Sequence, residues 1–409
     1  MPTNIFNKFL EKHHNYKKEK QIEEGKSTLI DSSFYQSNIV PKFSITFKDD
    51  EYIKEIAKHN ISPVIKGNQA TFVYKGKVKF KVNLISELTY WAANRNTCLK
   101  KVDGEDIYHI TLELPEDARI EYKITVNNQW ILDPMNHLKC SNGIGGENSY
   151  VIMDKYKRVH ETIKKHDIKH GRIEKIEFNG KSIKGKRMIS VYLPHGYDEN
   201  SKESYPVMYL HDGDDYIRHS HAINTLDNLI AEKRIKPIIG VFINPVDRLV
   251  EYMYNQKYSK LIVEEIIPQI DSSYRTIPKA EARGIMGASL GGIISFFTAY
   301  SYPSVFKNVA GQSSSFLYLE HEITRFIENS NEKFNIYFDV GRFESLINPN
   351  RRILEVYKRK NLDFFYQEIN EGHTWSNWGT HFKDALTFFW SNNEKSPRNI
   401  IVLPENPKI

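Results

Sequence analysis

The pattern of hydrophobic and polar positions changes along the chain. Residues 1–40 are polar, rich in Lys and Glu and only weakly periodic, which predicts a solvated helix or arm. Within residues 41–155, short segments such as 71–74 and 120–126 alternate apolar and polar side chains, and turn residues separate them. This alternation places apolar side chains on one face of a sheet. These residues are therefore expected to form a small, immunoglobulin-like β-sandwich domain.

A different pattern begins after a charged connector at residues 156–170. Compact apolar runs, such as residues 206–210, alternate with longer segments of helical periodicity, such as residues 258–270. Buried parallel strands are continuously apolar, and parallel strands need long crossover connections that are usually helical. Residues 171–395 are therefore expected to form an α/β domain with a mainly parallel sheet, and residues 396–409 a C-terminal tail.

Composition narrows the function classes. The 409 residues exceed what one hydrophobic core usually serves, which favours two domains. The 57 basic and 51 acidic residues are intermixed, so the net charge of +6 favours anionic ligands weakly and predicts no nucleic-acid partner. There is no apolar run of membrane-spanning length and no apolar segment typical of a secretory signal. We expect a cytoplasmic protein without a membrane partner; oligomeric state is not predicted.

One motif carries the expected chemistry. Residues 284–297 run from a short apolar strand through Gly287-Ala288-Ser289-Leu290-Gly291 into a helical pattern. This is the strand–turn–helix setting that the G-x-S-x-G nucleophile elbow requires, since the glycines permit a tight turn that exposes the serine hydroxyl. The segment predicts an α/β-hydrolase fold with Ser289 as its nucleophile.

A serine nucleophile needs a base and an orienting carboxylate later in the chain. His373 follows a predicted last strand and a Gly, and it precedes a terminal helix, whereas His381 lies within that helix and is expected to be a satisfied surface or packing residue. Glu344 is the predicted acid because it lies in the loop after a strand at residues 335–341. Asp339 is the alternative, although its position inside the strand directs it towards a sheet surface.

The oxyanion of an acyl-transfer reaction needs two backbone N–H donors. Leu290, directly after the nucleophile, supplies the first. The loop at residues 211–215 is expected to supply the second from Asp214, because Gly213 allows the backbone to turn inward. His211 and the acidic residues beside it lack the ligand spacing of a zinc or calcium site, so no metal and no other cofactor is expected.

Several motifs together resemble the esterase D family of α/β-hydrolases, over roughly residues 170–392. They are residues 191–194, 211–214, 287–292 and 341–345, Arg248 with Glu251 and Tyr252, and Gly372-His373 followed by Trp378. Residues 122–149 resemble the early-set sandwiches that precede catalytic domains, and such a module is expected to pack over the active site. The whole arrangement is similar to enterochelin esterases. This resemblance implies a serine carboxylic-ester hydrolase without a cofactor, with the nucleophile at Ser289, the base at His373 and the acid at Glu344.

The substrate implied by the resemblance is a small ester, such as the trilactone of a ferric catecholate siderophore. Arg342, Trp375 and Trp378 are the candidate contacts for such an aromatic trianion. Packing of the last helix against the sheet is the alternative role for Trp378. For Arg248 and Glu251, the two roles left open are a substrate contact and a structural ion pair. The other functions left open are a feruloyl or acetyl esterase acting on carbohydrate, and a non-catalytic binding protein on a hydrolase scaffold.

Overall fold

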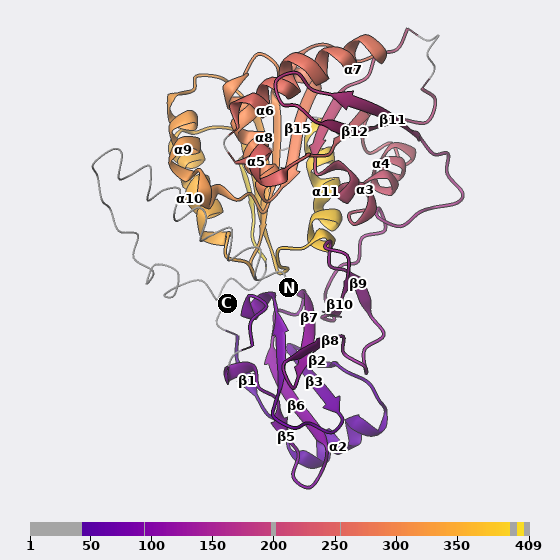
Figure 1. The fold of residues 1–409 in the computed structure, drawn as a ribbon, viewed down its shortest axis with the longest axis vertical. Coiled ribbons are helices and arrows are strands. Elements are labelled where there is room, and N and C mark those ends of the chain that lie inside the picture. Colours follow the sequence, from indigo (N-terminus) through magenta and orange to yellow (C-terminus); the bar gives the residue numbers. More distant parts are fainter. Residues whose placement is uncertain (1–42, 94, 198–201, 254, 393–398, 405–409) are drawn as a thin grey trace, which may run out of the picture.

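The computed structural model describes residues 43–93, 95–197, 202–253, 255–392 and 399–404. The polar segment at residues 1–40 lies outside this range. Figure 1 shows a β-rich part below and a larger α/β part above it. The segment between β10 and β11, which includes the predicted connector, contains neither a helix nor a strand.

The β-rich part, called the sandwich below, consists of two antiparallel sheets that share a core. The first contains β1 (Ile45–Thr46), β2 (Val64–Lys66), β3 (Gln69–Lys75), β5 (Lys100–Lys101) and β6 (Ile107–Glu113). The second contains β4 (Val82–Ser86), β7 (Arg119–Val126), β8 (Gln129–Ile131), β9 (Lys139–Ser141) and β10 (Glu147–Ile152). Phe72 of the first sheet packs edge-to-face on Tyr122 of the second, with ring centroids 4.9 Å apart. Side chains alternate between the two faces of each strand, so the apolar faces of the two sheets are buried against each other.

One helix of this part was not predicted from the sequence. Helix α2 (Asp50–Lys58) begins at Asp49, whose side chain accepts a hydrogen bond from the Tyr52 N–H. Its apolar residues Ile53 and Ile56 pack on Val73 of the first sheet. The helix therefore covers the outer face of that sheet.

The α/β part is built on one nine-stranded sheet, in the order β11-β12-β14-β13-β15-β16-β17-β18-β19. The strands are β11 (Arg172–Asn179), β12 (Lys186–Leu193), β13 (Val207–His211), β14 (Ile239–Ile243), β15 (Arg283–Ala288), β16 (Asn308–Gln312), β17 (Asn335–Gly341), β18 (Phe364–Ile369) and β19 (Ile400–Val402). The pairs from β14 to β19 are parallel, and β11 and β12 are antiparallel. The expected mainly parallel sheet is confirmed.

The C-terminal end of the sheet corrects one expectation. Residues 396–409 were expected to be a tail, and β18 the last strand. Instead, β19 extends the sheet beyond β18, with Phe365 aligned to Ile400. An open strand edge carries unpaired N–H and C=O groups, and the β-branched run of β19 satisfies part of them.

Helices cover both faces of this sheet. One face packs on α3 (Gly213–Arg218), α4 (Ala222–Ala231) and α11 (Trp375–Trp390). The other packs on α5 (Arg248–Tyr252), α6 (Gln256–Lys260), α7 (Ile267–Ser273), α8 (Leu290–Ser301), α9 (Glu320–Asn329) and α10 (Ile347–Arg359). Alternate residues of β13 point into the two cores, Met208 into the first and Tyr209 into the second.

The helix predicted at residues 258–270 is present, with a local change of winding. It begins as α6, passes through a π-helical turn at Leu261–Ile266 and continues as α7. In the part of the chain that the structure describes, no helix combines the length and the apolar character needed to cross a membrane.

Candidate active site

Ser289 lies at the sharp turn between β15 and α8. Its backbone angles, φ 56° and ψ −117°, are strained for a residue with a side chain. A Cβ at Gly287 would come within 2.4 Å of the Gly291 backbone, so the turn can close only with glycine there. The predicted strand–turn–helix setting is therefore present, and the strain is held by the elements on either side.

The hydroxyl of Ser289 has a serine neighbour. Its Oγ lies 3.1 Å from Ser315 Oγ, and the Ser315 N–H donates to the Ser289 carbonyl oxygen at 3.0 Å. Among the described residues, Ser289 and His373 share no hydrogen bond. Catalytic hydrogen bonds are often long in a free enzyme and tighten when substrate binds.

His373 and Glu344 form the closest polar pair of the site. His373 Nδ1 lies 2.5 Å from Glu344 Oε2, and the other carboxylate oxygen accepts hydrogen bonds from the Gly341 N–H and Ser313 Oγ. A carboxylate only accepts, so Nδ1 carries the proton. In the neutral imidazole, Nε2 then has a free lone pair and can accept a proton.

Trp378 packs against this pair. Its ring meets the His373 ring edge-to-face at 4.9 Å, and its indole N–H donates to Ser313 Oγ at 3.0 Å. Because Trp378 is only 5% exposed, the expectation of a substrate contact is replaced by the packing role. Trp375 is half-buried between Trp378 and the sandwich, where a Cβ at Gly143 would come within 2.3 Å of its ring.

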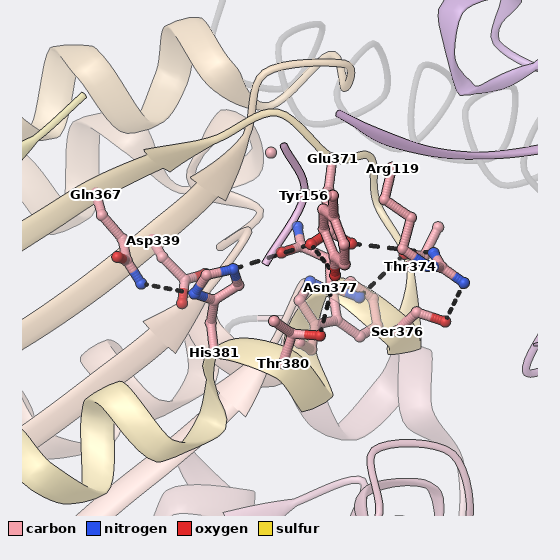
Figure 2. Close-up of polar contacts among 12 residues, drawn as sticks. Arg119, Tyr156, Asp339, Gln367, Glu371, Thr374, Ser376, Asn377, Thr380 and His381 are labelled. Atoms are coloured by element: carbon pink, nitrogen blue, oxygen red, sulfur yellow. Dashed lines mark hydrogen bonds and ion pairs between the residues drawn. The ribbon is translucent and has the colours of Figure 1, made fainter. Parts of the chain in front are cut away.

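Asp339 and His381 belong to a second buried cluster, and His381 Nε2 lies 3.9 Å from Glu371 (Figure 2). Asp339 Oδ2 accepts hydrogen bonds from Tyr337 and Gln312, and burial raises the pKa of Asp339 to about 7. His381 Nδ1 lies 2.8 Å from Asp384, which raises the pKa of His381 even though burial opposes its charge. His381 is therefore a buried residue whose imidazole has its own carboxylate partner, and the structure brings Glu344 rather than Asp339 to His373.

The two expected oxyanion donors differ in availability. Leu290 is the first residue of α8, and the N–H groups of a first helical turn have no partner within the helix. The N–H of Asp214, by contrast, donates to Asn244 Oδ1 at 2.8 Å. The expectation of a free N–H at Asp214 is thus corrected, because the Asn244 side chain, from the loop after β14, accepts its hydrogen bond.

The neighbouring polar residues are engaged in structural pairs. Arg248 makes two hydrogen bonds to Asp212, at 2.9 and 2.8 Å, and Glu251 pairs with the buried Arg187. Buried His211 places Nδ1 3.0 Å from the Tyr258 hydroxyl. Arg248 and Glu251 therefore both belong to ion pairs, as the structural alternative predicted. They do not pair with each other: Arg248 pairs with Asp212, and Glu251 pairs with Arg187.

Arg342 is also unavailable to a ligand. Its side chain is buried, Nη1 donates to Asn370 Oδ1 at 2.9 Å, and Nε lies 4.0 Å from Glu368. The expectation that Arg342 binds an anionic substrate is corrected, because residues from the end of β18 enclose its guanidinium.

Sequence reasoning missed three residues near the site. Ser313 and Ser315 come from the loop after β16, and the Ser-Ser-Ser run there was the available signal. Tyr90 comes from the sandwich and was not signalled at all. Tyr90 is 40% exposed, and its partial burial, together with the nearby charge of Glu344, raises the pKa of its hydroxyl to about 12. A Cβ at Gly372, the residue before His373, would come within 2.2 Å of the Glu87 side chain of the sandwich, so the sandwich reaches the site.

Comparison with known proteins identifies the family. Residues 180–389, more than half of the chain, match the Esterase family model, described as "Putative esterase". Uncharacterized protein YjcH of Bacillus subtilis is 26% identical over 238 residues, which are 53% of this chain and 97% of that protein. An endo-1,4-beta-xylanase/feruloyl esterase of Xylanibacter ruminicola is 28% identical over 244 residues, 56% of this chain and 32% of that protein.

A solved structure extends the likeness to both parts of the molecule. The enterobactin esterase of Shigella flexneri, crystallised in the presence of enterobactin, superposes with a TM-score of 0.67 at 17% identity. The match covers 89% of this chain and 99% of that protein, so the shared fold includes the β-rich part. The chain therefore belongs to the esterase family, and it is an ester hydrolase whose fold resembles that of an enterobactin esterase.

Proposed function

We propose that this chain is a serine carboxylic-ester hydrolase that works through an acyl-enzyme. Ser289 is the nucleophile, His373 the general base and Glu344 the acid that orients the imidazole. The single observation that carries this proposal is the 2.5 Å contact between His373 Nδ1 and Glu344 Oε2. It leaves Nε2 as the basic atom, and it lies at the same edge of the parallel sheet as Ser289, which is held at a strained turn.

The proposed reaction has two halves. His373 Nε2 takes the hydroxyl proton while Ser289 Oγ attacks the ester carbonyl carbon, and the Leu290 N–H donates to the developing oxyanion. The C–O bond of the alcohol then breaks, and His373 returns the proton to the leaving oxygen. A water molecule, deprotonated by the same imidazole, hydrolyses the acyl-enzyme and regenerates Ser289.

The proposed second oxyanion donor is the N–H of Asp214. Asp214 can serve only if its N–H leaves Asn244 Oδ1, or shares its hydrogen with both acceptors, when substrate arrives. Both groups follow adjacent parallel strands, β13 and β14, and a rotation of the Asn244 side chain would free the N–H. On this condition, Asp214 is the second donor.

For the substrate, we propose the ester bonds of a catecholate siderophore. The support is the likeness of both parts of this chain, over 89% of its length, to an enterobactin esterase. A carbohydrate ester of feruloyl or acetyl type is the second candidate, favoured by the 28% identity to a protein named as a xylanase/feruloyl esterase. Trp375, half-buried at the sandwich boundary, is the aromatic side chain that remains a candidate contact for either.

A panel of esters tests this proposal. It contains cyclic and linear catecholate esters, each with and without ferric iron, together with feruloyl-sugar and acetyl-sugar esters; Ser289→Ala serves as the inactive control. We expect the highest kcat/KM with a catecholate ester and no turnover by the variant. A higher kcat/KM with a sugar ester would establish the second candidate. Failure of the native chain to hydrolyse any ester would favour a binding protein.

A further inference from the structure

The loop that carries His373 is bonded to the sandwich. Asn370, directly after β18, accepts a hydrogen bond from the Arg119 N–H at 3.1 Å and donates its side-chain amide to Asp117 Oδ1 at 2.6 Å. Arg119 is the first residue of β7 in the sandwich, and Asp117 lies two residues before that strand. The loop is thus attached to an element about 250 residues away in the chain.

The side chain of Arg119 holds the loop from the other end (Figure 2). One guanidinium nitrogen donates to Ser376 Oγ at 2.9 Å, and the other lies 3.1 Å from Glu121 and 3.9 Å from Glu371. Ser376 in turn donates to Glu121 at 3.0 Å. Glu371 and Ser376 lie two residues before and three residues after His373, so one buried guanidinium reaches both sides of it.

Close packing accompanies these bonds. A Cβ at Gly372 would come within 2.2 Å of the Glu87 side chain, so the residue before His373 touches the sandwich directly. Glu87 Oε2 accepts the Glu121 N–H at 2.9 Å. Phe343, next to the acid Glu344, is packed into the core of the sandwich. Both loops of the proposed acid–base pair therefore lie against the same domain.

We infer that Arg119 is a positioning residue for His373, so that the sandwich is a working part of the active site. This inference rests on the proposed role of His373 as the base. Arg119 does not touch the imidazole; it fixes the backbone on both sides and so fixes the direction of Nε2. A displacement of about 1 Å in such a group costs roughly a hundredfold in rate.

The chemistry of the cluster explains why arginine is required. A planar guanidinium offers donors in several fixed directions, whereas a lysine ammonium is a compact charge on a flexible stem. Here the donors are divided between a hydroxyl and two carboxylates on three segments. Burial raises the pKa of Glu371, and the charge of Arg119 opposes that rise. Without Arg119, this buried carboxyl would keep only the charge of His381 to oppose that rise.

Ser376 gives the gentlest test. Ser376→Ala removes the hydroxyl that joins Arg119 to Glu121 without leaving a buried charge unpaired. We expect kcat to fall roughly tenfold with KM nearly unchanged, and Ser376→Thr, which keeps the hydroxyl, to restore most of the loss. The matched control is Ser62→Ala, since Ser62 also donates to a buried sandwich carboxylate, Asp133, at 2.8 Å, but its hydrogen-bond partners do not include a residue of the His373 loop. It should lower Tm and leave kcat as in the native chain.

A second measurement does not depend on turnover. The proton between His373 Nδ1 and Glu344 should give a strongly downfield NMR signal, assigned by its loss in His373→Ala. We expect this signal to shift or broaden in Arg119→Lys and Ser376→Ala and to stay unchanged in Ser62→Ala. If the native chain is an active esterase but the Ser376 variants and Arg119→Lys match it in kcat and in this signal, the inference is wrong. If the native chain neither hydrolyses esters nor reacts at Ser289, the proposed function has failed instead.

Discussion

Glu344 Oε2 lies 2.5 Å from His373 Nδ1, although 29 residues separate them in the chain. They meet because β17 and β18 are parallel neighbours, with Gly341 aligned to Ile369, so the loops after them leave the same edge of the sheet. The Gly341 N–H donates a hydrogen bond to Glu344 Oε1, which orients the carboxylate so that its other oxygen contacts the imidazole. The expected acid and base are therefore preorganised by the sheet.

The first prediction separates the two candidate acids. Glu344→Gln should lower kcat strongly, because an amide cannot stabilise the imidazolium, yet it should leave measurable activity from the oxyanion donors and substrate binding. His373→Ala should be more damaging, and Asp339→Asn should have the smallest effect of the three. Initial rates of ester hydrolysis, with Tm as the folding check, decide the order. An inactive but stably folded Asp339→Asn beside a fully active Glu344→Gln would reverse the assignment.

The second prediction concerns the pH dependence of stability at Asp339. Its pKa in the fold is about 7, against an ordinary value of 3.8, so the folded state binds this proton more tightly than the unfolded chain does. The stabilisation from this site is complete below about pH 4, is lost as pH rises towards 7, and then levels off. This loss amounts to at most a few kcal/mol, roughly, in the free energy of unfolding. The variant Asp339→Asn should not show it.

Urea unfolding at several pH values between 4 and 8 measures this pH dependence of the free energy of unfolding. The matched control is Asp154→Asn, because Asp154 is exposed. The difference between native chain and Asp339→Asn should grow with pH, while that for Asp154→Asn stays flat. A constant difference for Asp339→Asn would show that its carboxyl is ionised throughout.

The third prediction tests the ion pair of Glu251. Glu251 and Arg187 are both buried and joined by two hydrogen bonds of 2.8 and 3.0 Å. Glu251→Gln should lower the free energy of unfolding by about 3–5 kcal/mol, because it leaves a buried guanidinium without its counter-charge. The adjacent pair of Lys186 and Glu177 is exposed, so Glu177→Gln should change stability by less than about 1 kcal/mol. Equal effects in denaturant unfolding would contradict the structural role.

The fourth prediction addresses the second oxyanion donor. Asp214→Pro removes one N–H in the first turn of α3, where proline is tolerated, and should lower kcat by about 10²–10³-fold. Asn244→Ala removes the competing acceptor and should retain activity. Both need Tm values close to that of the native chain. Full activity of a folded Asp214→Pro would mean that another group supplies the second hydrogen bond.

The sequence was most informative where the structural signal is local. The elbow around Ser289 needs only a strand, small residues and a helix in succession, and β17 was predicted with its observed limits because its apolar run is short and bounded. The expectations that the structure corrects depend on contacts distant in the chain. Asp214 meets Asn244 across 30 residues, and Arg342 meets Asn370 across 28. No local pattern encodes such partners, and the same is true of the attachment of Arg119 to the His373 loop.

The most direct test of the account is to locate the nucleophile chemically. A fluorophosphonate reacts with a serine only when a positioned base activates it, and peptide mass spectrometry locates the adduct. Reaction of the native chain should give one adduct, on Ser289, and Ser289→Ala should give none. Because Ser315 Oγ lies 3.1 Å from Ser289 Oγ, the mapping must separate the two residues. An adduct on Ser315, or an unlabelled native chain, would contradict the claim that Ser289 is the activated nucleophile.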